Sequence, residues 1–541
     1  MIQKLYIVDI KKKSYINISD YLADGDIIAL TPFSIYMLEE KDIKYLTFHN
    51  LISVENFRND ILNKIAQFKK VILPYDYLES TLYRYSMVIN YFYYIDIIKK
   101  FLDYKKYDEI IYITDTMNSK TTISSLLNNK TSLISSLHNI KTVHVDNLVD
   151  YKFYIKRSRK FKFKRILELI LSGRILAKDR KNIYKYDNMF YKKFYNKLNK
   201  KLNKIEVIDK LNSNYRRDII KFFSNSYSLN VEKLLIEFID EMQKEIKAIN
   251  KNKEPLKIIP FTFLATIQNA IYAKSINKSE YPAIFYQHGN YLYQSIFLKD
   301  SEIRPANINF VINDYTKKIF EDLGAKKVYS VGSLLFNRPI LQKKRDYDFL
   351  YITQGHDYMG NNCYVDFNNS LHSIDGYELY KKHLNIINIF GKNFTQKTIC
   401  IKIHPGMLTS MLYVPLLEVS KTYNNITIET SSSTHNLIEK SKYIISDYFT
   451  TDFLNRKLHY KRDILMFCGS PTPLPKETIK DMKKMFILID NIEDLKDKIQ
   501  NIEKITKNRE KNDEIIEYYS SKKCDTKKIV TQILEKEFHG R

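Results

Sequence analysis

Short apolar runs alternate with longer stretches of helical periodicity along most of the chain, and this alternation limits the possible folds more than any other feature. In the first part of the chain, helix-like stretches at Pro32 to Glu40, 54–68 and 78–104 separate runs that resemble strands. Those runs are Lys4 to Ile10, Asp26 to Thr31, Ile43 to Phe48, Val71 to Leu73 and Glu109 to Thr114. Strands that alternate with helices predict a parallel sheet covered by helices on both faces. The sequence therefore predicts a doubly wound first domain.

The strand pattern resumes near residue 256 and then repeats in a second set. We assign four runs to the first domain, namely Leu256 to Ile259, Ala283 to Gln287, Ile308 to Ile312 and Lys327 to Val331. The second set has helix 376–391, helical last residues, and strands at Phe349 to Thr353, Thr398 to His404, Ile426 to Glu429, Tyr443 to Ser446, Ile464 to Phe467 and Phe486 to Ile489. Ser333 to Asp346 reads as a linker, so we predict domains at 1–338 and 339–541. Two doubly wound Rossmann-like domains facing a cleft make the α/β architecture known as GT-B.

Residues 150–250 interrupt the alternation and predict a helical insertion in the first domain. The chain carries a net charge of +25, and residues 151–205 hold 19 Lys and Arg against 3 acids. This segment accounts for about 16 of the excess charges, more than an AT-rich codon bias would concentrate in one place. Interleaved Tyr and Phe side chains suit an anionic membrane surface or an acidic acceptor chain. A solvated helical face is the alternative, and no recognition motif indicates nucleic acid.

Composition and the length of the apolar runs indicate the cellular compartment in which the protein is expected. Hydrophobic residues make up 44% and charged residues 28%, which is typical of a folded protein. The four cysteines are scattered without the spacing of a zinc site or a disulfide framework, which favours a reducing compartment. Asp9 lies within the first apolar run, so this run is not a signal peptide. No run approaches the roughly 18 apolar residues of a membrane span, so we expect a cytoplasmic protein, soluble or peripheral at the inner face of the cytoplasmic membrane.

The run Cys400 to Gly406 ends in polar side chains where a ligand is expected. Ligands bind beyond the carboxyl ends of the strands in an open parallel sheet. Lys402 and His404 are two residues apart on the predicted strand, so they point to one face and could reach the same phosphate. Pro405 then stops the strand. Taken alone, a histidine before a proline at a strand end is more often an ordinary surface histidine.

The strand Tyr443 to Ser446 repeats this layout. Asp447 begins a turn, and Thr450 and Thr451 place two hydroxyl groups where the next helix is expected to start. A helix start offers free amide N–H groups and a partial positive charge, which favour phosphate. Each threonine alone could be an ordinary helix cap. The pairing of the two strand ends is what indicates an anion pocket.

Other strand ends extend the candidate site. Ser432 and Ser433 follow a predicted strand and could touch ribose or base, although a helix cap explains them equally well. Gln354 and Gly355 follow another strand and could line the floor of the cleft. In the first domain, Gly289 lets the backbone turn sharply and approach a ligand closely.

Five motifs in fixed order resemble one family of enzymes. They are Gln287-His288-Gly289 at a strand end, 306–315, 323–333, Lys402-Ile403-His404-Pro405, and 446–451. In this order they resemble the bacterial GT-B transferases of surface polysaccharide, nearest to the CDP-glycerol glycerophosphotransferases of teichoic-acid and capsule synthesis. They are also similar to bacterial sialyltransferases and Kdo transferases. The resemblance covers about half the chain, and Thr450 and Thr451 stand where these families usually have two serines.

The resemblance implies a glycosyltransferase of capsule, lipopolysaccharide or teichoic-type polymer synthesis. Its donor would be a CMP- or CDP-activated sialic-type or Kdo-type sugar, or glycerol phosphate, and its acceptor a glycan or lipid-linked glycan. His404 and Lys402, with the hydroxyls of Thr450 and Thr451, would hold the donor phosphate. Such groups can meet the charge of the leaving phosphate, so we expect no metal and no cofactor.

The acceptor hydroxyl needs a general base, and His288 is the first candidate because imidazole titrates near neutrality. The resemblance supports this, since the histidine of the His-Gly motif is essential in the glycerophosphotransferase-like families. A structural role in holding the turn at Gly289 is the alternative, and Asp314 and Asp447 are other candidate bases. The pair in Asp24-Gly25-Asp26 matches a metal-binding motif of GT-A enzymes, but it precedes a strand, and we interpret it as a turn.

Two alternatives remain open from the sequence. A GT-B transferase could instead use a UDP- or GDP-sugar. A non-catalytic protein of the same fold could use the basic insertion to hold an anionic polymer or lipid.

Overall fold

The computed structural model describes the chain in separate segments. They are residues 2–10, 17–75, 81–114, 140–145, 213–229, 232–252, 273, 282–287, 299, 303–332, 344–353, 364–365, 371–372, 376–403, 412–430, 432, 434–446, 463–467, 476–507, 513–520 and 524–539.

The first sheet is parallel and has the strand order of a Rossmann fold. Its strands are β1 (Lys4–Asp9), β2 (Asp26–Ala29), β3 (Leu46–Thr47), β4 (Glu109–Thr114) and β5 (Lys141–His144). They are arranged in the order β3-β2-β1-β4-β5. The chain order changes direction between β1 and β4, which makes that point the topological switch of the sheet. The prediction of a doubly wound first sheet is confirmed.

Local signals in the sequence set the helices beside this sheet. The helices are the short η1 (Ile18–Tyr21), α1 (Pro32–Glu39), α2 (Phe48–Leu51), α3 (Val54–Ile72) and α4 (Leu82–Lys105). Helix α1 begins with proline at its first position, and the Thr31 side chain accepts the N–H of Ser34 at 3.2 Å. Ser53 caps α3 by accepting the N–H of Asn56 at 3.2 Å.

The predicted strand at Val71 to Leu73 is wrong, because α3 continues through Ile72. Ile61, Ile65, Phe68 and Ile72 are all buried, and their spacing of three or four residues keeps them on one helical face. The helical periodicity outweighs the local apolar run. The short strand β5 was not predicted.

The second sheet is parallel and has six strands. They are β9 (Tyr347–Ile352), β12 (Ile399–Lys402), β13 (Ile426–Glu429), β14 (Ser441–Ser446), β15 (Asp463–Phe467) and β16 (Ile487–Ile489). Their order β13-β12-β9-β14-β15-β16 is again the Rossmann order. The two-stranded hairpin of β10 (Tyr364–Val365) and β11 (Leu371–His372) lies apart from it. The α/β fold with two doubly wound parallel sheets is confirmed, and six of the predicted strands match those of the second sheet.

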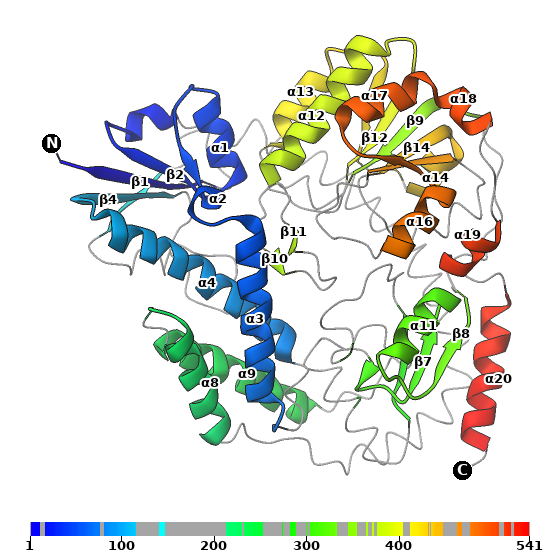
Figure 1. Cartoon of the computed structure of the whole chain (residues 1–541), viewed down its shortest axis with the longest axis horizontal. Coiled ribbons are helices and arrows are strands. Elements are labelled where there is room, and N and C mark those ends of the chain that lie inside the picture. The colour runs from blue at the N-terminus through cyan, green and yellow to red at the C-terminus, as the bar shows by residue number, and fades with distance from the viewer. Residues whose placement is uncertain are drawn as a thin grey trace.

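Seven helices belong to the second half of the chain besides α11 and α20. They are α12 (Gly376–Asn393), α13 (Tyr413–Ser420), α14 (Thr434–Glu439), α16 (Lys476–Met485), α17 (Ile492–Gln500), α18 (Ile502–Lys507) and α19 (Asp513–Tyr519) among the residues described. Figure 1 shows α12, α13 and α17 gathered over the second sheet, with α16 on its other side.

A third sheet differs from the prediction. Strands β6 (Ile284–Tyr286), β7 (Ile308–Val311) and β8 (Val328–Ser330) come from runs that the sequence places in the first domain, but among the described residues they pair only with one another and not with the first sheet. Helix α11 (Asp314–Asp322) packs on this sheet, and helix α20 (Thr526–His539) returns from the carboxyl end of the chain to cover it (Figure 1). The predicted boundary at residues 338 and 339, the linker and the strand at 256–259 fall outside the described residues, except for the linker's last residues.

The first two sheets share one apolar core through α1 and α12. Side chains from β1, β2, β9 and β12 belong to the same buried cluster. The Tyr377 hydroxyl donates to the Glu39 carboxylate, and the rings of Tyr36 and Tyr380 meet edge to face with centroids 6.0 Å apart. These contacts fix α12, beside the second sheet, against α1, beside the first.

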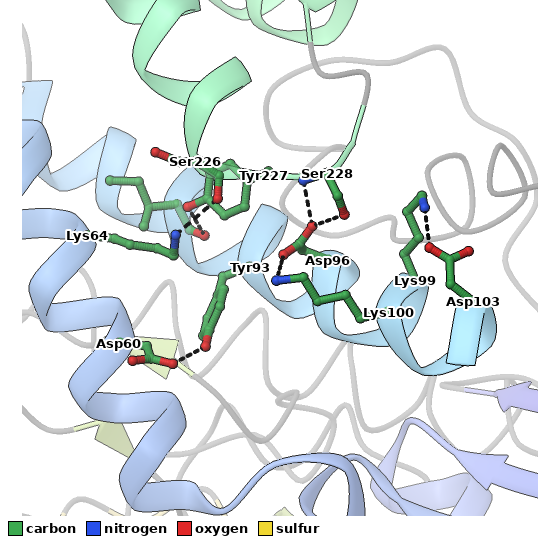
Figure 2. A network of polar contacts seen from close by, with 11 residues as sticks. Asp60, Lys64, Tyr93, Asp96, Lys99, Lys100, Asp103, Ser226, Tyr227 and Ser228 are labelled. Carbon is green, nitrogen blue, oxygen red and sulfur yellow. Dashed lines mark hydrogen bonds and ion pairs between the residues drawn. The ribbon is translucent and has the colours of Figure 1, made fainter. Parts of the chain in front are cut away.

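The second half of the insertion is helical, as predicted. Helices α8 (Ser213–Ser226) and α9 (Glu232–Asn252) pack beside α3 and α4, while the basic residues 151–205 lie outside the described residues. Figure 2 shows the polar contacts that fix the turn between α8 and α9. Asp96 of α4 accepts the backbone N–H and the hydroxyl of Ser228 at 2.8 and 2.5 Å, and pairs with Lys100 at 2.9 Å.

Lys64 of α3 contributes to the same contact. Its ammonium donates to the Ser226 carbonyl at 3.1 Å and lies 4.7 Å from the centre of the Tyr227 ring (Figure 2). Burial lowers the pKa of Lys64. Burial alone would raise the pKa of Asp96, but the hydrogen bonds from Ser228 and Lys100 outweigh it and hold that pKa below its ordinary value. The helices α8 and α9 are thus joined to α3 and α4 by charged hydrogen bonds as well as by apolar packing.

Candidate functional site

Four neighbouring strands of the second sheet end on the same rung. Lys402 of β12 pairs with Glu429 of β13 on one side and with Ile352 of β9 on the other, and Ile352 also pairs with Ser446 of β14. These are the last residues of the four strands. The sheet therefore lines up an ammonium, a carboxylate and a hydroxyl along its carboxyl edge, where an α/β sheet binds ligands.

These side chains also share one face of the sheet. Side chains alternate between faces along a strand, and Leu350, Cys400 and Ile444 belong to a buried cluster on one of them. Lys402 lies two residues beyond Cys400, and Ser446 two beyond Ile444, so both project to that face. Lys402 is 7% exposed and Ser446 is completely buried. The polar row thus forms the outer margin of an apolar layer.

The thiol of Cys400 lies beneath this row. Burial raises its pKa to about 12, the nearby Glu429 raises it, and Lys402 and Lys440 lower it. At that pKa the thiol stays protonated near neutral pH and is not a nucleophile. Cys400 is a core residue, and the effects of Lys402 and Glu429 on its pKa show that both charged side chains lie near it.

Glu429 shapes the loop that follows β13. Its Oε1 accepts the backbone N–H of Thr430 at 3.0 Å and that of Ser432 at 3.2 Å. Ser432 is half-buried and stands two residues before α14, so its predicted place near a helix start is confirmed. Glu429 was not predicted, although it ends the run Ile426 to Glu429 as Lys402 ends its own strand.

Thr353 fixes the end of β9 against β12. Its backbone N–H and its hydroxyl both donate to the carbonyl of Lys402, each at 3.2 Å, and the side chain is buried. The strand end that leads to Gln354 is therefore tied to the strand that carries Lys402.

Gln287 performs a similar task in the third sheet. Its Oε1 accepts the backbone N–H of Ile312 at 2.8 Å, and its amide nitrogen donates to the Thr316 hydroxyl at 3.4 Å. Asn313 caps the start of α11 by accepting the N–H of Thr316 at 2.8 Å, and its own amide donates to the Tyr519 carbonyl at 2.8 Å. The buried Gln287 thus ties the end of β6, just before His288, to the start of α11.

Two of the predicted site residues are described and ten are not. Lys402 and Ser432 belong to neighbouring strand ends, because Lys402 pairs with Glu429 and Glu429 accepts from Ser432. The others lie outside the described residues: His288, Gly289, Gln354, Gly355, His404, Pro405, Ser433, Asp447, Thr450 and Thr451. Of the other candidate bases, Asp314 is exposed at the first position of α11, and Asp447 also lies outside the described residues.

Two observations bear on metals and membranes. Among the residues described, no group of three or more His, Cys, Asp or Glu side chains is arranged to hold a metal ion. Asp26 accepts the Tyr107 hydroxyl at 2.6 Å and is the first residue of β2, so it lies at the amino edge of the first sheet. Within the same residues, no helix has the length and apolar character of a membrane span.

No family model and no curated protein matches the chain. Among solved structures it is similar to the UDP-GlcNAc 2-epimerase of Methanocaldococcus jannaschii in complex with UDP-GlcNAc and UDP, at 13% identity and a TM-score of 0.27 over 99% of this chain and 100% of that one. The UDP-GlcNAc 2-epimerase of Neisseria meningitidis bound to UDP-GlcNAc gives 13% and 0.32, covering 50% and 74%.

A third similar structure is MurG of Acinetobacter baumannii, at 10% identity and a TM-score of 0.31 over 82% of this chain and 95% of that one. With TM-scores this low, the overlays assign no activity to the chain. The features that bear on function are the strand orders and the residues at the strand ends.

Proposed function

We propose that this protein is a GT-B transferase that moves a sugar, or a glycerol phosphate, from a nucleotide-activated donor to a glycan acceptor in the synthesis of a bacterial surface polymer. The observation that carries the proposal is the row of Glu429, Lys402, Ile352 and Ser446 at the carboxyl edge of the second Rossmann sheet. A doubly wound sheet binds nucleotides at this edge. A lysine ammonium held there suits the phosphates of the donor.

The chemistry follows from the charge of the leaving group. When the bond between the transferred group and the nucleotide phosphate breaks, negative charge develops on the phosphate oxygen. Lys402 would meet that charge without reorganising, because it is fixed in a strand and largely shielded from water. His404, Thr450 and Thr451 would add donors, His288 would take the proton of the acceptor hydroxyl, and no metal is required by this scheme.

For the nucleotide we propose CMP or CDP, on the Lys-x-His-Pro and paired-hydroxyl motifs of the sequence. A UDP- or GDP-sugar is the second candidate. The deciding experiment is a thermal-shift panel of CMP, CDP, UDP and GDP, because a ligand at 100 times its dissociation constant adds about 2.7 kcal/mol of stability. The cytidine nucleotides should raise the melting temperature most. A larger shift with UDP would mean that the donor is a UDP-sugar. No shift with any of the four nucleotides would refute the proposal.

Two histidine variants separate a transferase from a binding protein of the same fold. His404→Ala and His288→Ala should each abolish release of CMP or CDP from the donor while leaving polymer binding intact. Full activity in both variants would remove these residues from the proposed site.

We further propose that residues 151–205 hold the enzyme at an anionic membrane, where a lipid-linked acceptor is presented. Vesicles containing phosphatidylglycerol should sediment the protein at low salt and release it at high salt, because salt screens exposed charges. A variant that lacks residues 151–205 should stay in solution. Unchanged sedimentation of that variant would show that the basic segment does not carry the attraction.

A further inference from the structure

Asp9 is a buried carboxylate with one oxygen left without a hydrogen bond. It is the last residue of β1 and is completely buried. Its Oδ2 accepts the Tyr112 hydroxyl at 2.5 Å, whereas its Oδ1 has no partner. Among the described residues, no Lys, Arg or His pairs with it. A buried acceptor left unsatisfied destabilises the folded state, and more so when it is charged, so the presence of Asp9 here calls for an explanation.

The position of Asp9 points to a ligand. The order β3-β2-β1-β4-β5 places the topological switch between β1 and β4, and Asp9 pairs there with Thr114, the last residue of β4. Both side chains are buried, and both end strands that are otherwise mostly apolar. Ligands of doubly wound sheets bind just outside the carboxyl ends of the strands at this point.

The surroundings hold Asp9 in one place. The N–H of the next residue, Ile10, donates to the Ser34 hydroxyl at 3.0 Å, and the Ile10 carbonyl accepts the Thr31 hydroxyl at 2.5 Å. From α4, Tyr91 lies close by: burial raises the pKa of Tyr91 and the charge of Asp9 raises it further. The position of Oδ1 of Asp9 is therefore fixed by its surroundings, and what it lacks is a hydrogen-bond donor.

We propose that Oδ1 of Asp9 accepts a hydrogen bond from a hydroxyl group of a polyhydroxy ligand bound at the carboxyl edge of β1 and β4. This inference rests on the proposed function, within which the ligand is the acceptor glycan. A carboxylate suits a sugar because each hydroxyl can donate one hydrogen bond to it, and hydrogen bonds to charged groups are the stronger ones. An ordered water that satisfies Oδ1 permanently is the competing explanation.

The chain supplies a matched control in the same sheet. Asp26 accepts the Tyr107 hydroxyl at 2.6 Å, as Asp9 accepts that of Tyr112. Asp26 is exposed and begins β2, so it lies at the opposite edge of the sheet. Asp9→Asn and Asp26→Asn therefore make the same chemical change at the two edges.

The test measures polyol binding by saturation-transfer NMR, with glycerol, lactose and N-acetyllactosamine as probes, in the presence of CMP or CDP. We expect Asp9→Asn to weaken probe binding at least tenfold and Asp26→Asn to leave it unchanged. The melting temperature of the ligand-free Asp9→Asn protein should be equal to or above that of the wild type, because the buried carboxyl group with an unpaired oxygen is removed. Tyr112→Phe, which frees the carboxylate to turn, should weaken binding if Asp9→Asn does not fold.

Several results would overturn the inference. Wild-type affinity for the probes in Asp9→Asn, a fall in its melting temperature without loss of binding, or no binding of any probe to the wild type would each do so. The nucleotide shift of the same variants is recorded separately. If no nucleotide binds the wild type, the proposed function fails, while the polyol measurement still judges Asp9.

Discussion

Replacing Lys402 with methionine tests the central element of the candidate site. Methionine keeps most of the length of the side chain and removes only its charge. Lys402 is 7% exposed, and its neighbours on the same rung are Glu429 and Ile352. The substitution should therefore weaken the interaction with the phosphate of a bound nucleotide, and the packing of the strand should change little.

The size of the effect follows from the charge. A hydrogen bond to a charged group contributes about 1.5–3 kcal/mol, which corresponds to a loss of roughly 10- to 150-fold in nucleotide affinity. If the wild type is saturated at 100 times its dissociation constant, the nucleotide adds about 2.7 kcal/mol of stability. A hundredfold weaker Lys402→Met protein would gain only about 0.4 kcal/mol at the same concentration. Turnover should fall further, by about 2.7–4 kcal/mol in the barrier, because the charge grows in the transition state.

The assay combines calorimetric titration of the nucleotide with thermal unfolding. Lys440→Met is the matched control, because Lys440 precedes β14 at the opposite edge of the same sheet and pairs with Asp346 at 2.6 Å. We expect this control to bind the nucleotide as the wild type does. Equal affinity in Lys402→Met and the wild type, or an equal loss in both variants, would refute the assignment of Lys402 to the phosphate.

Three further predictions concern the framework around the site. Asp96→Ala should destabilise the protein by about 2–3 kcal/mol, since the two bonds from Ser228 end on one charged oxygen. Because the folded pKa of Asp96 is lowered, the part of this difference that comes from the carboxylate charge should be complete above about pH 4 and be lost as pH falls through the folded pKa; urea unfolding that shows no such decrease would contradict it. Gln287→Leu should cost about 1–3 kcal/mol by leaving the buried N–H of Ile312 unpaired, and hydrogen exchange at that amide should accelerate. Gly25→Ala should cost about 1–3 kcal/mol, because its Cβ would lie 2.7 Å from the Lys4 carbonyl oxygen; an unchanged melting temperature would show that the turn can move.

Much of the fold could be predicted from the spacing of apolar residues and from the residues that begin and end helices and strands. Isoleucine-rich runs bounded by helical stretches predicted both Rossmann sheets, and Pro32 predicted the first turn of α1. The pairing of strands could not be predicted to the same extent. Ile284 and Ile308 belong to strands as convincing as those of the first sheet, yet they pair only within a separate sheet in the described residues. Strand periodicity specifies which face is buried, whereas the choice of partner depends on contacts distant in sequence.

The site was only partly predictable for a related reason. Lys402 was recognised because it interrupts an apolar run, and the same feature marks Asp9 and Glu429, which end the runs of β1 and β13. Sequence alone does not tell which of these strand ends are neighbours. The register supplies that information by pairing Lys402 with Glu429 and Asp9 with Thr114.

The first sheet ends in the carboxylate of Asp9, whereas the second ends in Lys402 beside Glu429, and this difference leads to a final prediction. Asp9 offers an acceptor for hydroxyl donors at the edge of the first sheet, and Lys402 offers a cation for phosphate at the edge of the second. If the sheets divide the two substrates between them, Lys402→Met should weaken nucleotide binding roughly 10- to 150-fold and leave polyol binding intact. Asp9→Asn should do the reverse, because each substitution removes the group that suits only one ligand.

Both ligands should be titrated into both variants under the same conditions, with Lys440→Met and Asp26→Asn as controls at the opposite edges of the two sheets. Comparable losses of both ligands in both variants would mean that the two residues act on one site or on folding. The division of substrates between the sheets would then be wrong, because two independent strand ends cannot couple so closely unless they share a ligand or a structural unit.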